Sequence, residues 1–146
     1  MIVRVLDEIK AKICDELLTK LIQDENKYDK SIDKSFIVKD YFKKVIKDEN
    51  NILLCFYEDN IIKGFIFIKP IKNNNENGYL IDSLYVEEEF RNKSIAKKLI
   101  KEAIKYINNK NVKFIEINTL YDNVIAYNIY KKLGFKEFRI NLRLDI

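Results

Sequence analysis

The sequence predicts a single α/β-layered domain, in which helices cover both faces of a mixed central sheet. Three observations support this fold class. Apolar spacing is helical near the start, alternates in the middle as a hairpin would, and then switches between strand and helix patterns. The composition, 47% hydrophobic and 34% charged over 146 residues, can supply one buried core. No linker or repeat divides the sequence, so the domain is expected to span residues 1–146.

In the first half, steps of three and four residues indicate helices, and alternation indicates strands. The expected elements are a strand over Met1–Leu6, a helix from Asp7 to Ile22, a second helix over Val38–Ile46, and a hairpin of Ile52–Glu58 and Ile61–Ile68 with its turn at Asp59-Asn60. Asp7 and Ser35 are the expected caps of the two helices, because their side chains can accept a hydrogen bond from the first turn.

The second half begins after an Asn-rich loop predicted over Asn73–Gly78. The expected elements are a strand over Tyr79–Val86, a helix over Ile95–Ile107 that stops at Asn108-Asn109, a strand over Val112–Thr119, a helix over Asn123–Leu133, and a last strand over Phe135–Leu144. Gly134 suits the end of the last helix, where a left-handed residue is common. The predicted order is β-α-α-β-β-β-α-β-α-β.

Composition excludes several classes of function. The absence of histidine removes every mechanism with an imidazole base and nearly every zinc site, so no metal is expected. Cys14 and Cys55 lie in apolar runs and are expected to pack in the core. A net charge of +4 is modest for a nucleic-acid binder. Neither a signal-peptide region nor an apolar run long enough to cross a membrane is visible, so we expect a cytoplasmic protein with no membrane partner.

The segment from Leu84 to Leu99 carries the clearest chemical signal. A strand leads through a short loop into an amphipathic helix, whose first N–H groups are unpaired and lie at the positive end of the helix dipole. Asn92, Ser94 and Ala96 are small or tolerate unusual backbone angles, which would let phosphate oxygens approach the main chain. Positive charge surrounds the loop, from Arg91, Lys93, Lys97 and Lys98. An ordinary turn with solvated lysines is the alternative.

Two motifs give this segment a family context. Arg91-x-x-Ser94-x-Ala96, after Leu84-Tyr85-Val86, resembles the acetyl-CoA pyrophosphate motif of the GNAT superfamily of N-acetyltransferases, and Asn123-x-x-Ala126-x-x-x-Tyr130-x-x-x-Gly134-Phe135 is similar to its second motif. The resemblance covers nearly the whole chain, is strongest from Gly78 to Phe135, and extends to Gly64 on the predicted third strand. It implies a single GNAT-like domain. Ser94 and Asn92 stand where the family often has glycine, and Glu88 where proline is common.

The resemblance implies an N-acetyltransferase that transfers the acetyl group of acetyl-CoA, its cosubstrate, directly to a primary amine. Tyr130 matches the family's general acid, Val86 the residue whose backbone N–H faces the thioester carbonyl, and Asn123 a residue that helps hold the pantetheine arm and also caps the helix. The implied cofactor-binding residues are Leu84, Val86, Arg91, Asn92, Lys93, Ser94, Ile95, Ala96, Asn123 and Tyr130.

The general base is open, because an amine with a pKa near 10 is almost fully protonated at neutral pH and needs a proton acceptor. Glu116 and Asp82 lie on the two central predicted strands and are the candidate catalytic carboxylates. Alternation places Glu116 with Asn118 on one face, and Asp82 with Leu80 and Leu84. Tyr79 and Ser83 are candidates to relay a proton through water.

Other functions stay open at this point. A catalytically inactive GNAT-like module that binds CoA or a metabolite is the main alternative, and a small basic RNA-binding domain explains the charge but not the paired motifs. The acceptor is expected to be a small-molecule or peptide amine, and neither nucleic acid nor a membrane is expected as a partner. A homodimer is left open. The acidic residues between the first two helices could attract a cationic amine or form a solvated loop; they are Asp24, Glu25, Asp29 and Asp33.

Overall fold

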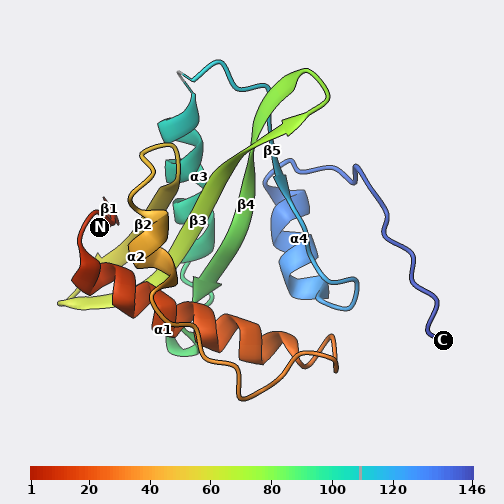
Figure 1. Cartoon of the computed structure of the whole chain (residues 1–146), viewed down its shortest axis with the longest axis horizontal. Helices are drawn as coiled ribbons and strands as arrows, with labels where there is room; N and C mark the ends of the chain where they lie inside the picture. The colour runs from red at the N-terminus through yellow and green to blue at the C-terminus, as the bar shows by residue number, and fades with distance from the viewer. Residues whose placement is uncertain (109) are drawn as a thin grey trace.

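The computed structural model describes residues 1–108 and 110–146, and its centre is a five-stranded sheet in the order β1-β2-β3-β4-β5 (Figure 1). The strands are β1 (Ile2–Arg4), β2 (Ile52–Glu58), β3 (Ile61–Asn73), β4 (Glu76–Val86) and β5 (Phe114–Ile117). The helices are α1 (Glu8–Glu25), α2 (Tyr41–Val45), α3 (Ile95–Ile107) and α4 (Val124–Lys132), with a short 3₁₀ turn η1 at Glu88–Phe90. Neighbouring strands are antiparallel except β4 and β5, which run parallel, so the sheet is mixed as predicted.

Helices cover both faces of the sheet, which confirms the predicted layers (Figure 1). The side chains of α1 and α2 pack on one face with Phe65 and Phe67 of β3. Those of α3 pack on the other face with Ile66 and Ile68, and Tyr130 and Leu133 of α4 join them from the edge. Alternation along β3 therefore serves two cores, and its apolar run is nearly continuous because neither face is solvated.

Both cysteines pack in the core on the α1–α2 side, as predicted. Cys14 of α1 and Cys55 of β2 are fully buried. Burial in apolar surroundings raises the pKa of both thiols, that of Cys55 to about 11. They are small apolar side chains in this fold rather than nucleophiles. In the described part of the chain, no helix combines the length and apolar character needed to cross a membrane.

The β3–β4 hairpin is longer than the sequence predicts. The predicted loop over Asn73–Gly78 is wrong, because pairing continues to Asn73↔Glu76 and leaves only Asn74 and Asn75 in the turn. The strand predicted over Ile61–Ile68 continues through Pro70, which pairs with Tyr79. Since β2 pairs with β3 only up to Ile68, the strand is an edge beyond that point, where proline's missing N–H costs no ladder hydrogen bond.

One predicted helix cap is confirmed and the other is wrong. The Lys10 N–H donates to the Asp7 carboxylate at 2.8 Å, so Asp7 caps α1. Ser35 does not cap α2, since its backbone N–H and hydroxyl both donate to Asp33 in a local turn. The helix starts later, after Asp40, and its first turn is held by Asp15, whose carboxylate accepts the Phe42 N–H at 3.0 Å.

The predicted last strand over Phe135–Leu144 does not form in this structure. Phe135 packs against Tyr130 with ring centroids 5.9 Å apart, but residues 136–146 are exposed and belong to no strand (Figure 1). The alternation is real, yet β5 spans only Phe114–Ile117 and the segment has not paired with it. The observed order therefore ends at α4. The sequence predicts that this helix stops at Asn108-Asn109. Asn108 is the C-cap of α3, and Asn109 lies outside the described residues.

Candidate active site

The strands β4 and β5 separate beside the residues that the motifs single out. They pair from Gly78↔Phe114 to Ile81↔Ile117, and no further. On the other edge of β4, the Glu87 N–H donates to the Lys63 carbonyl of β3 at 2.9 Å. Because successive residues of a strand direct their backbone groups to opposite edges, the N–H groups of Leu84 and Val86 face the opening beside β5. The opening therefore has unpaired donors along one side.

The loop after β4 adopts the conformation that glycine usually supplies. Asn92 has φ +66° and Ser94 has φ +60°, both in the left-handed region. Asparagine tolerates this region better than most residues, whereas a serine Cβ costs of order 1 kcal/mol there. These are the positions where the motif often has glycine, so the loop keeps its shape although the residues differ.

The start of α3 favours an anion. Ser94 is the N-cap of α3 but makes no side-chain cap hydrogen bond, and the first turn has no acidic residue. Its first turn instead exposes Lys97 and Lys98, whose positive charges are repelled by the positive end of the helix dipole. The Ile95 side chain is buried in the core with the other apolar residues of α3. Free N–H groups and unbalanced positive charge together suit a phosphate or pyrophosphate group.

Arg91 ties this loop to the rest of the site. Its Nε donates to the Val86 carbonyl at 2.9 Å, and its guanidinium lies over the Tyr85 ring and 3.4 Å from the Asp24 carboxylate of α1. Lys20 of α1 also pairs with Glu87. These contacts fix the end of β4 against α1, so the orientation of the Val86 N–H does not depend on the loop alone.

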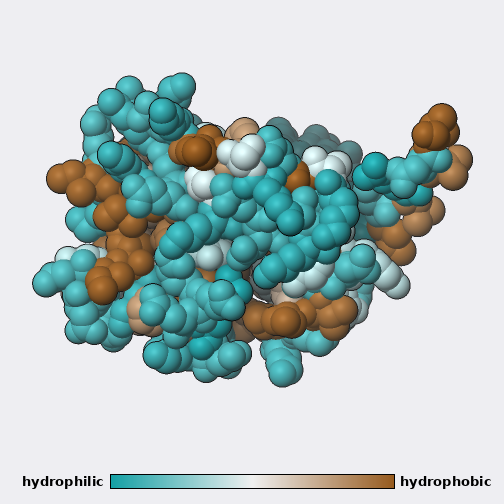
Figure 2. All heavy atoms as spheres, turned by 90° about the horizontal axis from the view of Figure 1, so that it is seen from below, coloured by the Kyte–Doolittle hydropathy of each residue, from teal (hydrophilic) through white to brown (hydrophobic). Residues whose placement is uncertain are grey.

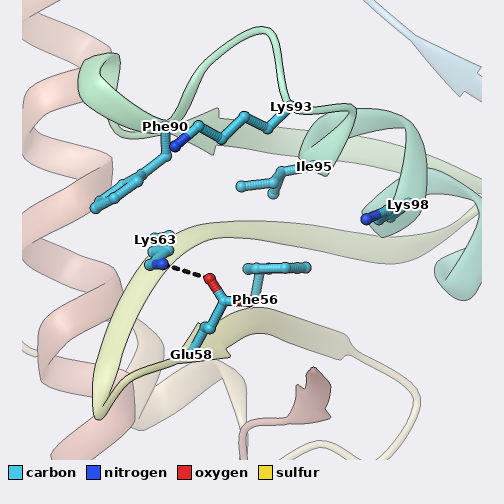
Figure 3. Close-up of a pocket in the computed structure, with 7 residues that line it drawn as sticks. All are labelled: Phe56, Glu58, Lys63, Phe90, Lys93, Ile95 and Lys98. Atoms are coloured by element: carbon cyan, nitrogen blue, oxygen red, sulfur yellow. Dashed lines mark hydrogen bonds and ion pairs between the residues drawn. The ribbon is translucent and has the colours of Figure 1, made fainter.

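A small cavity of about 130 Å³ lies on the other side of the same loop, between the start of α3 and the β2–β3 turn (Figure 3). Lys63, Lys93 and Lys98 face it, and Lys63 pairs with Glu58 while its ammonium lies 4.6 Å from the centre of the Phe90 ring. Of the predicted cofactor residues only Lys93 and Ile95 line this cavity. The opening beside β5, not this cavity, is where the predicted thioester-binding groups face.

Gly64 explains how β3 and β4 approach each other at the site. It pairs with Val86, and a Cβ at this position would lie 2.8 Å from the Tyr85 carbonyl oxygen and 3.2 Å from the Val86 Cα. Both neighbours are backbone atoms, which cannot turn aside. Glycine at 64 therefore sets the position of the end of β4.

The second motif folds as the helix that borders the opening. Asn123 caps α4, because its side chain accepts the Ala126 N–H at 3.2 Å. Tyr130 lies on the inner side of α4, packed against the core and Phe135. Burial, with a smaller contribution from the negative charge of Glu25, raises the pKa of Tyr130 to about 12. The hydroxyl therefore keeps its proton over the whole neutral range.

Glu25 is a neighbour of Tyr130 that the sequence analysis did not single out. It is the last residue of α1, and its charge acts on Tyr130 although 105 positions separate them in the sequence. Burial and the neighbouring charge of Asp29 raise the pKa of its carboxyl. In the sequence, Glu25 lies among four acidic residues after the predicted first helix. Nothing in the sequence distinguishes it from the other three.

The other acidic residues of that group have partners. Asp24 pairs with Arg91, and Asp29 and Asp33 accept hydrogen bonds from Ser31 and Ser35 in local turns. Those hydrogen bonds hold the pKa of Asp29 and of Asp33 below its ordinary value. Asp29 and Asp33 thus support local turns, Asp24 ties α1 to Arg91, and the charge of Glu25 acts on Tyr130.

The structure separates the two carboxylates proposed from the sequence. Asp82 lies in a β-bulge, because Phe67 pairs with Ser83 and Ile68 pairs with Ile81. The bulge breaks the alternation, so the prediction that Asp82 shares a face with Leu84 is wrong. Asp82 pairs with Lys69 at 3.0 Å on the α2 side, whereas Leu84 packs in the α3 core.

Glu116 of β5 is also paired. It accepts the Asn73 side-chain amide at 2.7 Å and lies 3.4 Å from the Arg139 guanidinium. Of the two relay candidates, Tyr79 donates to the Asn50 carbonyl at 3.0 Å and is committed there. Ser83 is buried, and its hydroxyl has no hydrogen-bond partner among the described residues.

Comparison with known proteins agrees with this geometry. The sequence profile of the acetyltransferase (GNAT) family matches residues 15–135. A spermidine N(1)-acetyltransferase of Thermoplasma acidophilum is 28% identical over 96 residues, which span 64% of this chain and 57% of that protein. A mutant of the BH1408 protein of Bacillus halodurans superposes with a TM-score of 0.88 at 18% identity, covering 100% of this chain and 99% of that one. An aminoglycoside N-acetyltransferase in complex with CoA superposes at 0.76 and 16% identity, with coverage of 100% and 99%.

The profile match includes the second half of α1, the splayed strands, the loop with its left-handed residues and the helix that carries Tyr130. The structural neighbours are too distant in sequence to show more than the fold, and they show the same one. On the profile match, which covers most of its length, the chain belongs to the acetyltransferase (GNAT) family of acyl-transferring enzymes.

Proposed function

We propose that this protein transfers the acetyl group of acetyl-CoA to a primary amine by direct attack in a ternary complex. The observation that carries the proposal is the end of β4–β5 pairing at Ile81↔Ile117, which leaves the N–H groups of Leu84 and Val86 facing an opening. The start of α3, which has no acidic residue in its first turn, supports it. Acetyl-CoA carries a thioester at one end of an extended pantetheine arm and a pyrophosphate at the other. The opening suits the thioester and the arm, and the start of α3 suits the pyrophosphate.

The residues present fit acetyl-CoA. The backbone N–H groups of residues 92–96 would hold the pyrophosphate, with Arg91 and Lys93 adding positive charge. The backbone of Leu84 and Val86 would hold the pantetheine arm along the free edge of β4, and Asn123 would border it from the start of α4. Acetyl-CoA supplies the acetyl group as a thioester, and the remaining chemistry belongs to the chain.

Val86 and Tyr130 would act on the two ends of the reacting bond. The Val86 N–H is a fixed donor that can stabilise the oxyanion forming on the carbonyl, an effect worth roughly 2.7–4 kcal/mol for comparable donors. Tyr130 can protonate the departing sulfur. Its raised pKa keeps it protonated until that moment, and the transfer is favourable only if the thiolate is desolvated as well.

For the general base we propose Glu25 beside the two carboxylates named from the sequence, Glu116 and Asp82. Glu25 acts on Tyr130 through its charge, and a raised pKa makes a carboxylate a better proton acceptor. The carboxylates of Asp82 and Glu116 already pair with Lys69 and Arg139, so a substrate ammonium group would have to compete with those cations for them. We therefore rank Glu25 first.

The acceptor is proposed to be a small cationic amine. A half-buried carboxylate at the end of α1 favours an ammonium group, and spermidine is the substrate named for one relative. Peptide amines fit the same reaction, and aminoglycosides are named for a structural neighbour.

The test is release of free CoA thiol when acetyl-CoA is mixed with a panel of spermidine, an aminoglycoside, single amino acids and an N-terminal peptide. Turnover is expected with at least one amine, with the polyamine among the best. Product mass, heavier by one acetyl group on an amine nitrogen, confirms the site of transfer. The Tyr130→Phe protein serves as the control for background hydrolysis.

One alternative is distinguished by the same experiment. Thermal stabilisation by acetyl-CoA without turnover on any amine would favour a binding module that has lost catalysis. The left-handed Ser94 is the observation that favours this alternative, because it is the strained departure from the motif.

A further inference from the structure

A concentration of positive charge surrounds the small cavity between the start of α3 and the β2–β3 turn. Lys63 of β3, Lys93 of the loop after β4 and Lys98 of α3 come from three different elements and face this one cavity (Figure 3). Among the described residues that line it, Glu58 is the one acidic residue. Three ammonium groups against one carboxylate leave the cavity walls with a net charge of about +2 at neutral pH.

Lys63 is the most buried of the three lysines. Its side chain is 10% exposed, whereas the two carboxylates that approach it, Glu58 and Asp59, are 52% and 80% exposed. An ammonium group has three N–H donors. Glu58 accepts a hydrogen bond from one of them, and the Asp59 carboxylate lies 3.6 Å away. Because a buried charge is costly unless its hydrogen bonds are made, Lys63 favours a further acceptor in the cavity.

Two aromatic rings hold the ammonium groups beside the cavity. Those of Lys63 and Lys93 lie 4.6 Å and 5.5 Å from the centre of the Phe90 ring, and that of Lys98 lies 5.9 Å from the centre of the Phe56 ring. In the part of the chain that the structure describes, neither Lys93 nor Lys98 pairs with a carboxylate. Like charges gathered in this way repel one another, and an anion between them would turn the repulsion into attraction.

The size and the charge of the cavity together select a phosphate group. Its volume of about 130 Å³ is well below the ~300–1,000 Å³ of sites for drug-sized ligands, so only a small group can enter. A phosphate group carries about −1.5 to −2 charges at neutral pH and presents three acceptor oxygens, one for each ammonium group. A single carboxylate would balance only part of the excess positive charge.

The cavity lies at an end of the molecule whose surface is mostly hydrophilic. Figure 1 shows the β2–β3 turn and the end of β4 at the lower side of the molecule. Figure 2, seen from below, shows hydrophilic residues over most of this face and apolar residues in separate patches. Such surroundings suit an ion that arrives from solvent better than a lipid or an apolar peptide.

We propose that this cavity is a binding site for a phosphate dianion, held by Lys63, Lys93 and Lys98 and separate from the acetyl-CoA site. The ion would be inorganic phosphate or the phosphate group of a small ester. Lysine suits this role because its ammonium group is a compact charge with three donors. The site itself does not depend on the proposed transferase activity.

The two anion sites would share one loop, so each ligand should affect the other. Lys93 and Ile95 line the cavity, and the backbone of residues 92–96 is proposed to bind the pyrophosphate of acetyl-CoA. A dianion in the cavity cancels positive charge beside the start of α3. Phosphate should therefore weaken acetyl-CoA binding, and acetyl-CoA should weaken phosphate binding by the same factor. This coupling, unlike the site itself, rests on the proposed function.

Nuclear magnetic resonance locates the phosphate directly. Titration with inorganic phosphate, at an ionic strength held constant with chloride, should shift the backbone amide signals of Phe56 and Lys63 in one saturable transition. Shifts confined to residues 92–96 would overturn the proposal, because they would place phosphate only on the acetyl-CoA side of the loop. Equal binding of methyl phosphate would identify an ester as a ligand, and binding of the free ion alone would identify inorganic phosphate.

Matched methionine variants test the ammonium groups. Lys63→Met and Lys98→Met should each raise the dissociation constant for phosphate about tenfold, because each loses a charge-assisted hydrogen bond. Lys101→Met removes the same charge from an exposed position of α3 that does not line the cavity, and should change it less than about twofold. Equal effects of Lys98→Met and Lys101→Met would reduce the site to a general effect of net charge. Since Lys98 is exposed, its variant tests the site even if the Lys63→Met protein fails to fold.

Calorimetric titration with acetyl-CoA at increasing phosphate concentrations tests the coupling. The apparent dissociation constant for acetyl-CoA should rise about fivefold and then level off, because a separate site saturates. In the Lys63→Met protein it should stay nearly constant over the same range. A rise without limit that persists in Lys63→Met would mean direct competition for the pyrophosphate site, and the coupling would be wrong. A protein that binds phosphate beside Lys63 but binds no acetyl-CoA would retain the phosphate site and overturn the proposed function alone.

Discussion

At the scale of single residues, Ser94 shows how a sequence departure can leave a local shape intact. The sequence alone left open whether a side chain at this position matters, because the answer depends on the sign of φ. The value of +60° shows that it does. The loop therefore has left-handed strain at both Asn92 and Ser94, and the surrounding contacts of Arg91 hold it in place.

Replacing Ser94 by glycine should relieve this strain. We expect the free energy of unfolding to rise by roughly 0.5–1 kcal/mol, and the dissociation constant for acetyl-CoA to change less than tenfold, because the backbone N–H is the main contact. Urea denaturation and calorimetry measure the two effects. Ser94→Ala, which keeps the Cβ and removes the hydroxyl, is the matched control, and a large loss of affinity in both variants would show that the hydroxyl makes the contact.

Tyr130→Phe tests the proposed acid. The ring would still pack against Phe135, so acetyl-CoA affinity and stability should be nearly unchanged while kcat falls by roughly 10²–10⁴. The loss should shrink with a thioester whose thiol is more acidic, since that leaving group needs its proton less. Single-turnover kinetics on the best acceptor measure the effect, and a wild-type rate in the variant would reduce Tyr130 to a packing residue.

Glu25 predicts a pH dependence with a definite sign. A base acts when ionised, and because burial and Asp29 raise the pKa of Glu25, activity should fall on acidification at a higher pH than an ordinary glutamate would give. Glu25→Gln should lower kcat and flatten this acidic limb of the pH–rate profile. The defect should lessen at high pH, where more of the amine is already neutral.

The KM of the same variant decides between two roles. If Glu25 only anchors the ammonium group, KM for the amine should rise while the acidic limb of kcat stays in place. Asp29→Asn is the matched control, because it removes the neighbouring charge and should move the limb toward lower pH without abolishing it.

At the scale of elements, glycines constrain the site in two distinct ways. Gly64 is fixed by contact, because a Cβ would meet the backbone of β4 at 2.8 Å, whereas Gly134 is fixed by its φ of +97° in open space at the end of α4. The sequence identified both positions through the family patterns. The structure supplies the different reasons, and these lead to different consequences on substitution.

Gly64→Ala should destabilise the fold by about 1–3 kcal/mol and weaken acetyl-CoA binding, because β4 must move at Val86. Gly134→Ala should cost about 1 kcal/mol with little effect on binding. Asparagine should recover part of the loss at position 134 and none at 64. Denaturation and calorimetry of the four variants test this, and equal recovery at both positions would mean that contact is not the constraint at Gly64.

At the scale of the whole molecule, the two cysteines report on the closed core. Cys14 and Cys55 are fully buried with raised thiol pKa values, so neither should react with a thiol reagent in the native protein. We expect labelling to require global unfolding and its rate to increase with urea along the unfolding transition. A thiol that reacts within seconds without denaturant would show that its part of the core opens locally.

The sequence by itself determined the elements whose partners are local. Helical periodicity located α1 and α3, Asp7 and Asn123 are caps that act within three residues, and β2 matches its predicted bounds because the turn at Asp59-Asn60 fixes them. The family motifs also assigned the loop of residues 91–96 and the helix with Tyr130 to the site, and the role of these residues in binding and catalysis stays a prediction.

The tertiary structure decided everything that depends on a distant neighbour. The bulge that turns Asp82 to the α2 side, the tolerance of Pro70, and the approach of Glu25 to Tyr130 all arise between elements far apart in the sequence. The last predicted strand belongs to the same class. Residues 135–144 do alternate, but a strand forms only when it pairs with the edge of a neighbouring strand, and residues 136–146 pair with none in this structure.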